Sequence, residues 1–230
     1  MKNEFISMAS HELRSPVTTI NGFVSMMLAD HYGKVNEEMR DGLKNVQSEA
    51  GRLGILVEDL MNVNLIEQGR IKVETEPTDI EPILEEVIKN LQAKAKKKDL
   101  VLNYETEETK KVVIKIDPKR LRQILINLID NAIKYTEKGS VNLILDTNNG
   151  KLSIKVKDTG IGMAPEQREK LFEKFYRVRS DKTKDIRGTG LGLWITKQLV
   201  ELMGGQIFID SIENTGTQAI VLFPLSTDDK

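Results

Sequence analysis

Apolar side chains in the first 67 residues recur at alternating intervals of four and three, which is the spacing of a coiled-coil seam. The seam positions are Ile6, Ser10, Leu13, Val17, Ile20, Val24 and Met27, then Met39, Leu43, Val46, Ala50, Leu53, Val57 and Leu60. This periodicity predicts one helix over residues 4–28 and another over residues 36–67, joined by a short connection at 30–36.

Two long helices with one short loop form an antiparallel hairpin, and a hairpin cannot cover its own apolar stripe. We therefore expect two copies of the chain to pair through residues 1–68 into a dimeric four-helix bundle. Pro16 lies inside the first helix and is expected to kink it or to loosen one turn, because proline lacks the backbone N–H.

Beyond Gly69 the pattern changes and predicts a mixed α/β layer fold, so the chain as a whole is expected to be an α+β multidomain protein. Strands are expected at 71–75, 100–105, 112–116, 141–146, 151–157, 207–211 and 218–223, and helices at 79–97, 117–136, 190–203 and within 165–177. Asp117-Pro118 supplies a cap and a first helical residue, and Asp79 is expected to cap the helix before it.

These patterns predict a helical hairpin over 1–68, a linker and first strand over 69–78, an α/β domain over 79–226 and a tail at 227–230. The five residues 94–98 include four lysines, which we interpret as a solvated helix end that suits the helix dipole.

Composition narrows the class of protein. A net charge of −1 on 230 residues argues against a chain that coats nucleic acid, and the absence of cysteine excludes disulfides and thiolate metal sites. No apolar run approaches the ~20 residues that span a bilayer, so we expect a cytoplasmic chain without membrane contact of its own. The helical pattern begins at once, which suggests a piece of a longer protein whose upstream part could carry a membrane anchor.

The first chemically suggestive block is Ser10 to Pro16. His11 and Ser15 are four residues apart and therefore neighbours on the outer face of the helix, with Glu12 on the same exposed side. A neutral imidazole is a nucleophile near neutral pH, and a nearby carboxylate can accept its other ring proton. Taken alone, such a histidine is more often a solvent-facing residue without a task.

A second block lies within the predicted helix 117–136. Asn127, Asn131, Lys134 and Tyr135 fall along one helical face. Amide oxygens can ligate Mg²⁺, which keeps several waters and shares substrate phosphates, and a lysine can meet phosphate as a point charge. Two asparagines in one helix are unusual for a simple polar stripe, because asparagine is a poor helix former.

Two glycine-rich turns follow. Asp158, Gly160 and Gly162 end a predicted strand, where an aspartate can accept a hydrogen bond from an exocyclic amine such as that of adenine. The run Gly188-Thr189-Gly190-Leu191-Gly192-Leu193 directly precedes a helix and can bind an anion with its backbone N–H groups. It fits a dinucleotide fingerprint only in part, and no βαβ unit follows it. The irregular cationic segment between the turns, which includes Arg177, is typical of a lid over phosphates.

In this order, the blocks resemble those of bacterial sensor histidine kinases, over nearly the whole chain. The matching blocks are the phosphoacceptor block at 10–16, the asparagine block at 127–135, the first glycine block at 158–162, the phenylalanine block at 172–177, the second glycine block at 188–193 and a last block at Gly216-Thr217. The resemblance implies a dimerisation and phosphotransfer hairpin followed by an ATP-binding domain of the gyrase, Hsp90, kinase and MutL type (the GHKL or Bergerat fold), a mixed sheet with helices on one face.

The resemblance also implies roles for single residues. His11 would receive the γ-phosphoryl group of ATP, with Glu12 as general base on the imidazole. Asn131 and Asn127 would hold Mg²⁺, and Lys134 and Arg177 would contact phosphate. Tyr135, the two glycine blocks and Asp158 would line the nucleotide, with Asp158 on the adenine amine and Thr217 supporting that contact through water. The phosphoryl group would pass to an aspartate of a response-regulator receiver domain.

One position departs from the family. Ser15 stands where threonine is usual, at a place tied to hydrolysis of the regulator's phosphoaspartate, and serine keeps the hydroxyl but lacks the methyl that restrains its rotamer. We expect the phosphatase activity to persist.

Two alternatives stay open. A water-activating ATPase of the same superfamily would carry a glutamate where this chain has Asn127. A non-enzymatic dimeric scaffold would have no need of His11, Glu12 and Asn131.

Overall fold

The computed structural model describes residues 2–106, 108, 111–178, 180–184 and 186–225, and for residues 2–11 it describes the backbone alone. The tail expected at 227–230 lies outside these residues. The chain forms two compact units, Met1–Ile71 and Lys72–Lys230. None of the helices in the described part of the chain is both long enough and apolar enough to cross a membrane.

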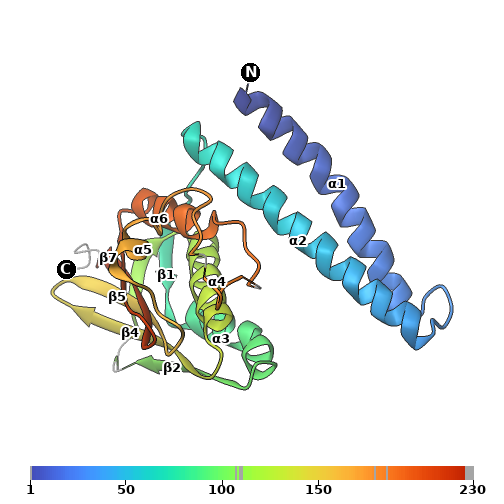
Figure 1. Ribbon diagram of the computed structural model, residues 1–230. Helices are drawn as coiled ribbons and strands as arrows, with labels where there is room; N and C mark the ends of the chain where they lie inside the picture. Colours follow the sequence, from blue (N-terminus) through green and yellow to red (C-terminus); the bar gives the residue numbers. More distant parts are fainter. Residues whose placement is uncertain (1, 107, 109–110, 179, 185, 226–230) are drawn as a thin grey trace. The chain divides into compact units, whose positions relative to one another are not determined.

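The first unit is the predicted antiparallel hairpin of α1 (Lys2–Leu28) and α2 (Glu37–Glu67), drawn in blue and cyan in Figure 1. Asn36 caps α2, because its side-chain oxygen accepts a hydrogen bond from the N–H of Met39 at 2.8 Å. Arg40 fixes the connection by donating to the carbonyl of Leu28 and pairing with Asp30, both at 2.8 Å.

The seam positions divide into two rows, each with the heptad spacing of seven residues. One row is buried between the helices and contains Val17, Val24, Ala50 and Val57. The other row is exposed and contains Leu13, Ile20, Met27, Met39, Val46 and Leu53. Each helix therefore presents one apolar row to its neighbour and a second row to solvent.

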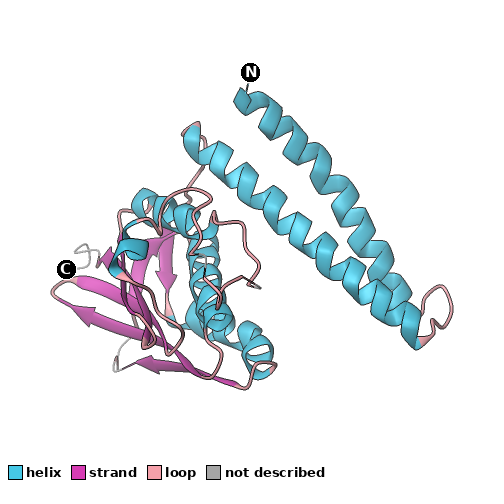
Figure 2. Ribbon diagram, in the orientation of Figure 1, coloured by secondary structure: helices cyan, strands magenta, loops and turns pink. Residues whose placement is uncertain are grey.

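The second unit is the predicted mixed α/β layer (Figure 2). Its helices are α3 (Glu81–Lys96), α4 (Pro118–Tyr135), α5 (Pro165–Glu169) and α6 (Gly192–Leu202). Its strands are β1 (Glu76–Asp79), β2 (Leu100–Thr106), β3 (Val113–Ile116), β4 (Gly139–Asn148), β5 (Lys151–Asp158), β6 (Gln206–Ile212) and β7 (Gly216–Pro224). Five strands form a sheet in the order β2-β4-β5-β7-β6, in which only β2 and β4 pair in parallel, and β1 pairs with β3 in a separate antiparallel ribbon.

Helices α3, α4 and α6 cover one face of this sheet, as expected (Figure 1). Alternate residues of the central strands point toward them, so that Val141, Leu143, Ile154 and Val156 are buried on this face. Asp158 continues the same alternation at the end of β5. The period of the strand therefore puts an aspartate on the helix-covered side of the sheet.

Three expected boundaries were wrong. Residues 71–75 form no strand, and β1 instead contains Pro77, which is tolerated because the two-stranded ribbon leaves an edge without ladder partners. Asp79 ends β1 and does not cap α3, which follows Ile80. The helix expected from Gly190 begins at Gly192.

The cap expected at Asp117 is confirmed. Its Oδ1 accepts hydrogen bonds from the N–H groups of Lys119 and Arg120 at 2.9 and 3.1 Å, and its Oδ2 accepts from the N–H of Glu74 at 3.0 Å. Burial alone would raise the pKa of this carboxyl, but the three N–H donors together with the charge of Arg120 hold the pKa below 3.8. One side chain therefore starts α4 and ties the segment before β1 to it.

Asp117→Asn should destabilise the second unit at neutral pH by about 1 kcal/mol, and Asp117→Ala by about 2 kcal/mol, because capping bonds weaken or disappear. The fluorescence of Trp194, the only tryptophan of the chain, follows urea unfolding of this unit. Because the folded pKa lies below the unfolded value of 3.8, the advantage of wild type over Asp117→Asn is present above pH 3.8 and is lost as the pH falls through the folded pKa. Asp146→Asn is the surface control. If the difference in unfolding free energy between wild type and Asp117→Asn does not change with pH, the capping role of the Asp117 carboxylate is wrong.

Candidate functional site

The end of β5 holds a buried carboxylate. The Asp158 side chain is only 7% exposed, and its Oδ1 accepts hydrogen bonds from the N–H groups of Gly160 at 2.8 Å and Thr217 at 3.2 Å. Among the described residues no donor reaches its Oδ2. Burial raises the pKa of Asp158 above 3.8, and the two backbone N–H groups offset only part of this effect. Two backbone N–H groups thus hold one carboxylate oxygen, and the other oxygen can accept a hydrogen bond from a ligand.

Glycines allow the surrounding chain segments to meet this carboxylate. A Cβ on Gly160 would lie 2.5 Å from the carbonyl oxygen of Tyr135, at the end of α4. Gly162 and Gly216 have φ values of +60° and +142°, and a Cβ on either would clash with backbone, of Ile212 and Asp158 respectively. The first glycine block therefore joins the end of α4 to the turn between β6 and β7.

Thr217 has a second contact besides its backbone bond to Asp158. Its hydroxyl lies 2.9 Å from the hydroxyl of Ser211 in the neighbouring strand, and the Ser211 hydroxyl donates to the carbonyl of Gly216 at 3.0 Å. Two hydroxyl groups therefore stand beside the carboxylate. Ser211 was missed by the sequence reasoning, and only the strand register, which pairs Ser211 with Thr217, could have indicated it.

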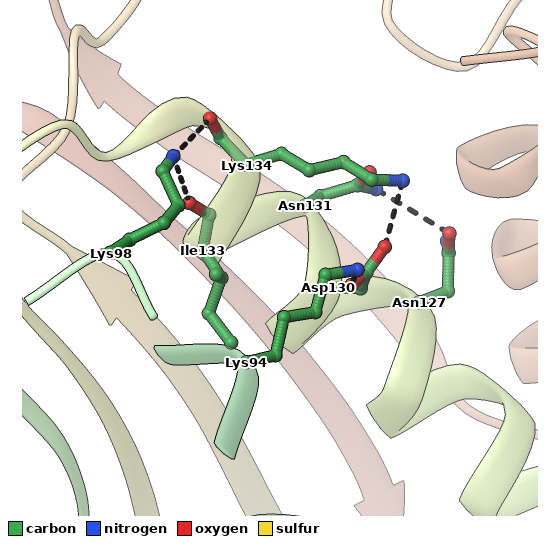
Figure 3. A network of polar contacts seen from close by, with 7 residues as sticks. All are labelled: Lys94, Lys98, Asn127, Asp130, Asn131, Ile133 and Lys134. Atoms are coloured by element: carbon green, nitrogen blue, oxygen red, sulfur yellow. Dashed lines mark hydrogen bonds and ion pairs between the residues drawn. The ribbon is translucent and has the colours of Figure 1, made fainter. Parts of the chain in front are cut away.

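On α4, the two asparagines are joined to each other and to α6. The side chain of Asn131 donates to Oδ1 of Asn127 at 3.5 Å, and Nδ2 of Asn127 donates to the buried hydroxyl of Thr196 at 2.8 Å (Figure 3 shows the first contact). A Cβ on Gly192 would clash with Oδ1 of Asn127, so the second glycine block leaves room for this amide. The sequence reasoning missed Thr196, whose one signal is a hydroxyl on an otherwise apolar face of the helix.

Charged groups surround Asp130, the residue before Asn131. Its carboxylate pairs with Lys134 one turn later at 2.7 Å and with Lys94 of α3 (Figure 3). Burial alone would raise the pKa of Asp130, but the two lysines hold it below 3.8, so the group is ionised near neutral pH. Lys134 therefore already has an anionic partner, and Tyr135 is half-buried beside it.

The second glycine block leads into α6. Leu191 is buried and its N–H donates to the hydroxyl of Thr189 at 3.2 Å, while Gly188 is exposed and Leu193 half-buried in the helix. Gly190 has a φ of +75°, and its carbonyl accepts a hydrogen bond from the N–H of Phe175 at 3.0 Å. The phenylalanine block and the second glycine block are therefore in contact.

Arg177 lies in the segment between α5 and α6. It donates to the carbonyl of Ile186, while its Nε is buried without a hydrogen-bond partner among the described residues. The same segment is joined to the turn between β6 and β7, because Lys182 donates to the side chain of Asn214 at 2.6 Å. The irregular stretch is thus held by one contact of Arg177 within itself and by one contact of Lys182 with the turn between β6 and β7.

The phosphoacceptor block lies on α1 in the first unit. The side chain of His11 lies outside the described residues, although the backbone there is helical. Glu12 and Ser15 are exposed. The helix continues through Pro16, which supplies no backbone N–H to the helix.

The asparagine side chains of α4 could hold Mg²⁺ only together with a bound phosphate and water. In the described part of the chain, no three His, Cys, Asp or Glu side chains gather into a metal site. An ion beside Asn131 and Asn127 would have amide oxygens as protein ligands and would take its other ligands from water and phosphate, as Mg²⁺ commonly does.

Two family profiles match the chain. Residues 1–69 match the His Kinase A (phospho-acceptor) domain, and residues 116–227 match the histidine kinase-, DNA gyrase B- and HSP90-like ATPase.

Curated relatives extend the match to nearly the full chain. It is 36% identical over 228 residues to the circadian input-output histidine kinase CikA of Synechococcus elongatus, covering 98% of this chain and 30% of CikA. It is 35% identical over 225 residues to the sensor protein SrrB of Staphylococcus aureus, covering 97% of this chain and 38% of SrrB. The chain thus spans about a third of the length of these relatives.

Solved structures agree with these matches. Full-length ShkA in complex with AMPPNP matches with a TM-score of 0.80 and 30% identity, over 99% of this chain and 47% of ShkA. Histidine kinase ThkA in complex with the response regulator TrrA matches with a TM-score of 0.64 and 25% identity, over 99% of this chain and 63% of ThkA. The chain belongs to the sensor histidine kinases of two-component systems, and it comprises their phosphoacceptor domain and their ATPase-like catalytic domain.

Proposed function

We propose that the second unit binds ATP with Mg²⁺, that the γ-phosphoryl group is transferred to His11, and that it then passes to an aspartate of a response regulator. The main support for this proposal is the Asp158 carboxyl group. It is buried, its burial raises its pKa, and one of its oxygens can still accept a hydrogen bond. Buried groups with perturbed pKa values cluster at functional sites, and this tendency favours a ligand at Asp158.

Adenine suits this acceptor. Its exocyclic amine donates a hydrogen bond, which Oδ2 of Asp158 can accept while Gly160 and Thr217 hold the other oxygen. The hydroxyls of Thr217 and Ser211 can hold a water that bridges to the base. Gly160 and Gly162 allow the nucleotide to approach the backbone, with Tyr135 beside it.

The phosphates would lie between α4 and the second glycine block. Asn131, with Asn127, would ligate Mg²⁺, and Lys134 and Arg177 would contact phosphate oxygens. The residues Gly188, Thr189, Gly190, Leu191, Gly192 and Leu193 would supply backbone N–H groups and room around the phosphates. Bound Mg²⁺ neutralises phosphate charge. The similarity to ShkA, solved with AMPPNP, supports this assignment.

In the transfer step, a ring nitrogen of His11 attacks the γ-phosphorus, the bond from phosphorus to the β–γ bridging oxygen breaks, and ADP leaves. The proton of the other ring nitrogen passes toward the carboxylate of Glu12, the general base. Phosphohistidine is a high-energy phosphoramidate, so transfer to a receiver-domain aspartate is feasible. Ser15 would orient a water for hydrolysis of the regulator's phosphoaspartate.

The amide side chain of Asn127 argues against an enzyme that hydrolyses ATP continuously with an activated water. Its amide cannot take a proton, and its Nδ2 is held by the hydroxyl of Thr196. Water-activating ATPases of this superfamily tend to carry a glutamate as general base at this place.

We further propose that the chain dimerises through residues 1–68. The exposed apolar row of Leu13, Ile20, Met27, Met39, Val46 and Leu53 supports this, as does an open apolar hollow of about 450 Å³ beside the loop, lined in part by Met27, Met39 and Leu43. A second hairpin would cover both and complete a four-helix bundle.

For the other boundaries, we propose a linker with the first strand at 69–78, an ATP-binding domain at 79–226 and a tail at 227–230. The division of the chain near residue 71 supports the first of these. The regulator would dock on the hairpin near His11. The similarity to ThkA, which was solved in complex with the response regulator TrrA, supports a response regulator as the partner. An ATP-dependent activity of this kind belongs in the cytoplasm.

His11→Ala should abolish acid-labile labelling from radiolabelled ATP, because the acceptor nitrogen is removed, while the affinity for MgATP stays unchanged. The matched control is His31→Ala, which removes the only other histidine, at the exposed hairpin connection, and should leave labelling intact. Full labelling of the His11 variant would refute the proposed acceptor.

Leu53→Glu should weaken the dimer by at least tenfold, because it puts a charge into the exposed apolar row. Sedimentation equilibrium at several concentrations measures the dissociation constant. Lys44→Glu, at an exposed position of α2 outside the row, is the charge-changing control. A wild-type chain that stays monomeric at high concentration would contradict the proposed bundle.

Asp158→Asn should weaken MgATP binding by at least tenfold, because the amide presents either its N–H₂ or an uncharged oxygen to the adenine amine. The same change should leave the second unit as stable as wild type or more stable at pH 7. Since the folded pKa lies above 3.8, ionisation costs wild type stability as the pH rises from 3.8 through the folded pKa, and asparagine avoids that cost.

Titration calorimetry and urea unfolding, followed by Trp194 fluorescence, measure the two effects of Asp158→Asn. The control is Asp146→Asn at a half-exposed site. A variant that loses affinity and stability together would indicate a structural role for Asp158.

A further inference from the structure

Two lysines at the end of α3 contact α4 and are not simply solvated, in contrast to the expectation from sequence. Lys98 donates to the carbonyls of Ile133, Lys134 and Thr136 at 2.8, 3.0 and 2.8 Å, and so occupies the C-terminal end of α4 (Figure 3 shows the first two contacts). Lys94, one turn earlier, forms an ion pair with Asp130. The last turns of α3 therefore hold the part of α4 that carries Asn131 and Lys134.

Asp130 stands between two cations from different helices. Its Oδ1 meets Lys94 of α3 and its Oδ2 meets Lys134 of α4 at 2.7 Å, so each oxygen has one lysine. The Asp130 side chain is 18% exposed, against 47% for Lys94 and 35% for Lys134. The carboxylate is thus the most buried member of the triad, and water screens its charge least.

We propose that Asp130 and Lys94 form a positioning pair that sets how strongly Lys134 attracts the phosphates of the nucleotide. The inference rests on the proposed nucleotide site, in which Lys134 contacts phosphate. Asp130 aims the Lys134 ammonium and also competes with phosphate for it. Lys94 neutralises part of the Asp130 charge and thereby weakens that competition.

This arrangement predicts opposite effects for its two members. Removal of the Asp130 charge leaves Lys134 without its anionic competitor in the triad, so MgATP binds more tightly, but the ammonium is no longer aimed and transfer slows. Removal of the Lys94 charge leaves Asp130 with Lys134 as its sole partner in the triad, so MgATP binds more weakly. A simple structural contact would lower affinity, or leave it unchanged, in both cases.

The experiment compares Asp130→Asn, Lys94→Met and the double variant in the full chain. Titration calorimetry measures the dissociation constant for MgATP, and the rate of His11 labelling at saturating ATP measures transfer. We expect Asp130→Asn to bind MgATP about two- to fivefold more tightly with a slower saturated rate, and Lys94→Met to bind about two- to fivefold more weakly. The double variant should bind like Asp130→Asn, because Lys94 acts through Asp130.

Two further variants test the charge and the location. Lys94→Arg keeps the positive charge and should restore wild-type affinity. Lys155→Met and Asp146→Asn remove the members of a comparable lysine–aspartate pair between β4 and β5, at 3.3 Å, and should change neither quantity. Trp194 fluorescence in urea verifies that each variant is folded before it is compared.

Shifts of affinity in the same direction for Asp130→Asn and Lys94→Met, or no shift in either, would overturn the inference. Lys134→Met separates this failure from failure of the proposed function. If Lys134→Met weakens MgATP binding while the pair has no effect, only the positioning pair is refuted. If Lys134→Met leaves the affinity unchanged, the phosphate contact itself is wrong and the inference is overturned with it.

Discussion

Backbone segments from the end of α4, the end of β5 and the turn between β6 and β7 approach one another closely around Asp158, because glycines at 160, 162 and 216 remove the Cβ atoms that would separate them. The contacts made possible include the N–H of Ile161 to the carbonyl of Tyr135 at 3.1 Å. This junction places one buried carboxylate at a fixed depth. The adenine contact proposed for Asp158 and the position of α4, with its asparagines and lysine, both depend on it.

The structure of the first unit is limited by the width of the apolar stripe on its two helices. A two-helix hairpin can bury one heptad row, here that of Val17, Val24, Ala50 and Val57, and must expose the next. The second unit closes its own core between a sheet and three helices. The phosphoacceptor hairpin is thus incomplete as a single copy, whereas the ATPase-like unit has a complete core.

The sequence predicted those parts that local chemistry determines. Asp117 with Pro118 marked the start of α4, and the strands expected at 141–146 and 151–157 lie within β4 and β5. It misplaced β1, because the alternation at 71–75 has no partner strand whereas Pro77 sits in a short ribbon. Two contacts depend on how neighbouring helices pack, namely those of Lys94 with Asp130 and of Thr196 with Asn127. The spacing of apolar residues within one helix does not predict such packing.

The contacts around the proposed nucleotide site join residues far apart in the chain. Asp158 and Thr217 are 59 residues apart, and Asn127 and Thr196 are 69 apart. Closing a loop of this length costs more conformational entropy than closing a short one, so contacts of this kind tend to form after local ones. The site should therefore form late in folding, after α4 and the β4–β5 hairpin are in place. A nucleotide that binds only the finished site then stabilises the whole unit against unfolding, and the supply of ATP becomes one determinant of how long the folded kinase persists.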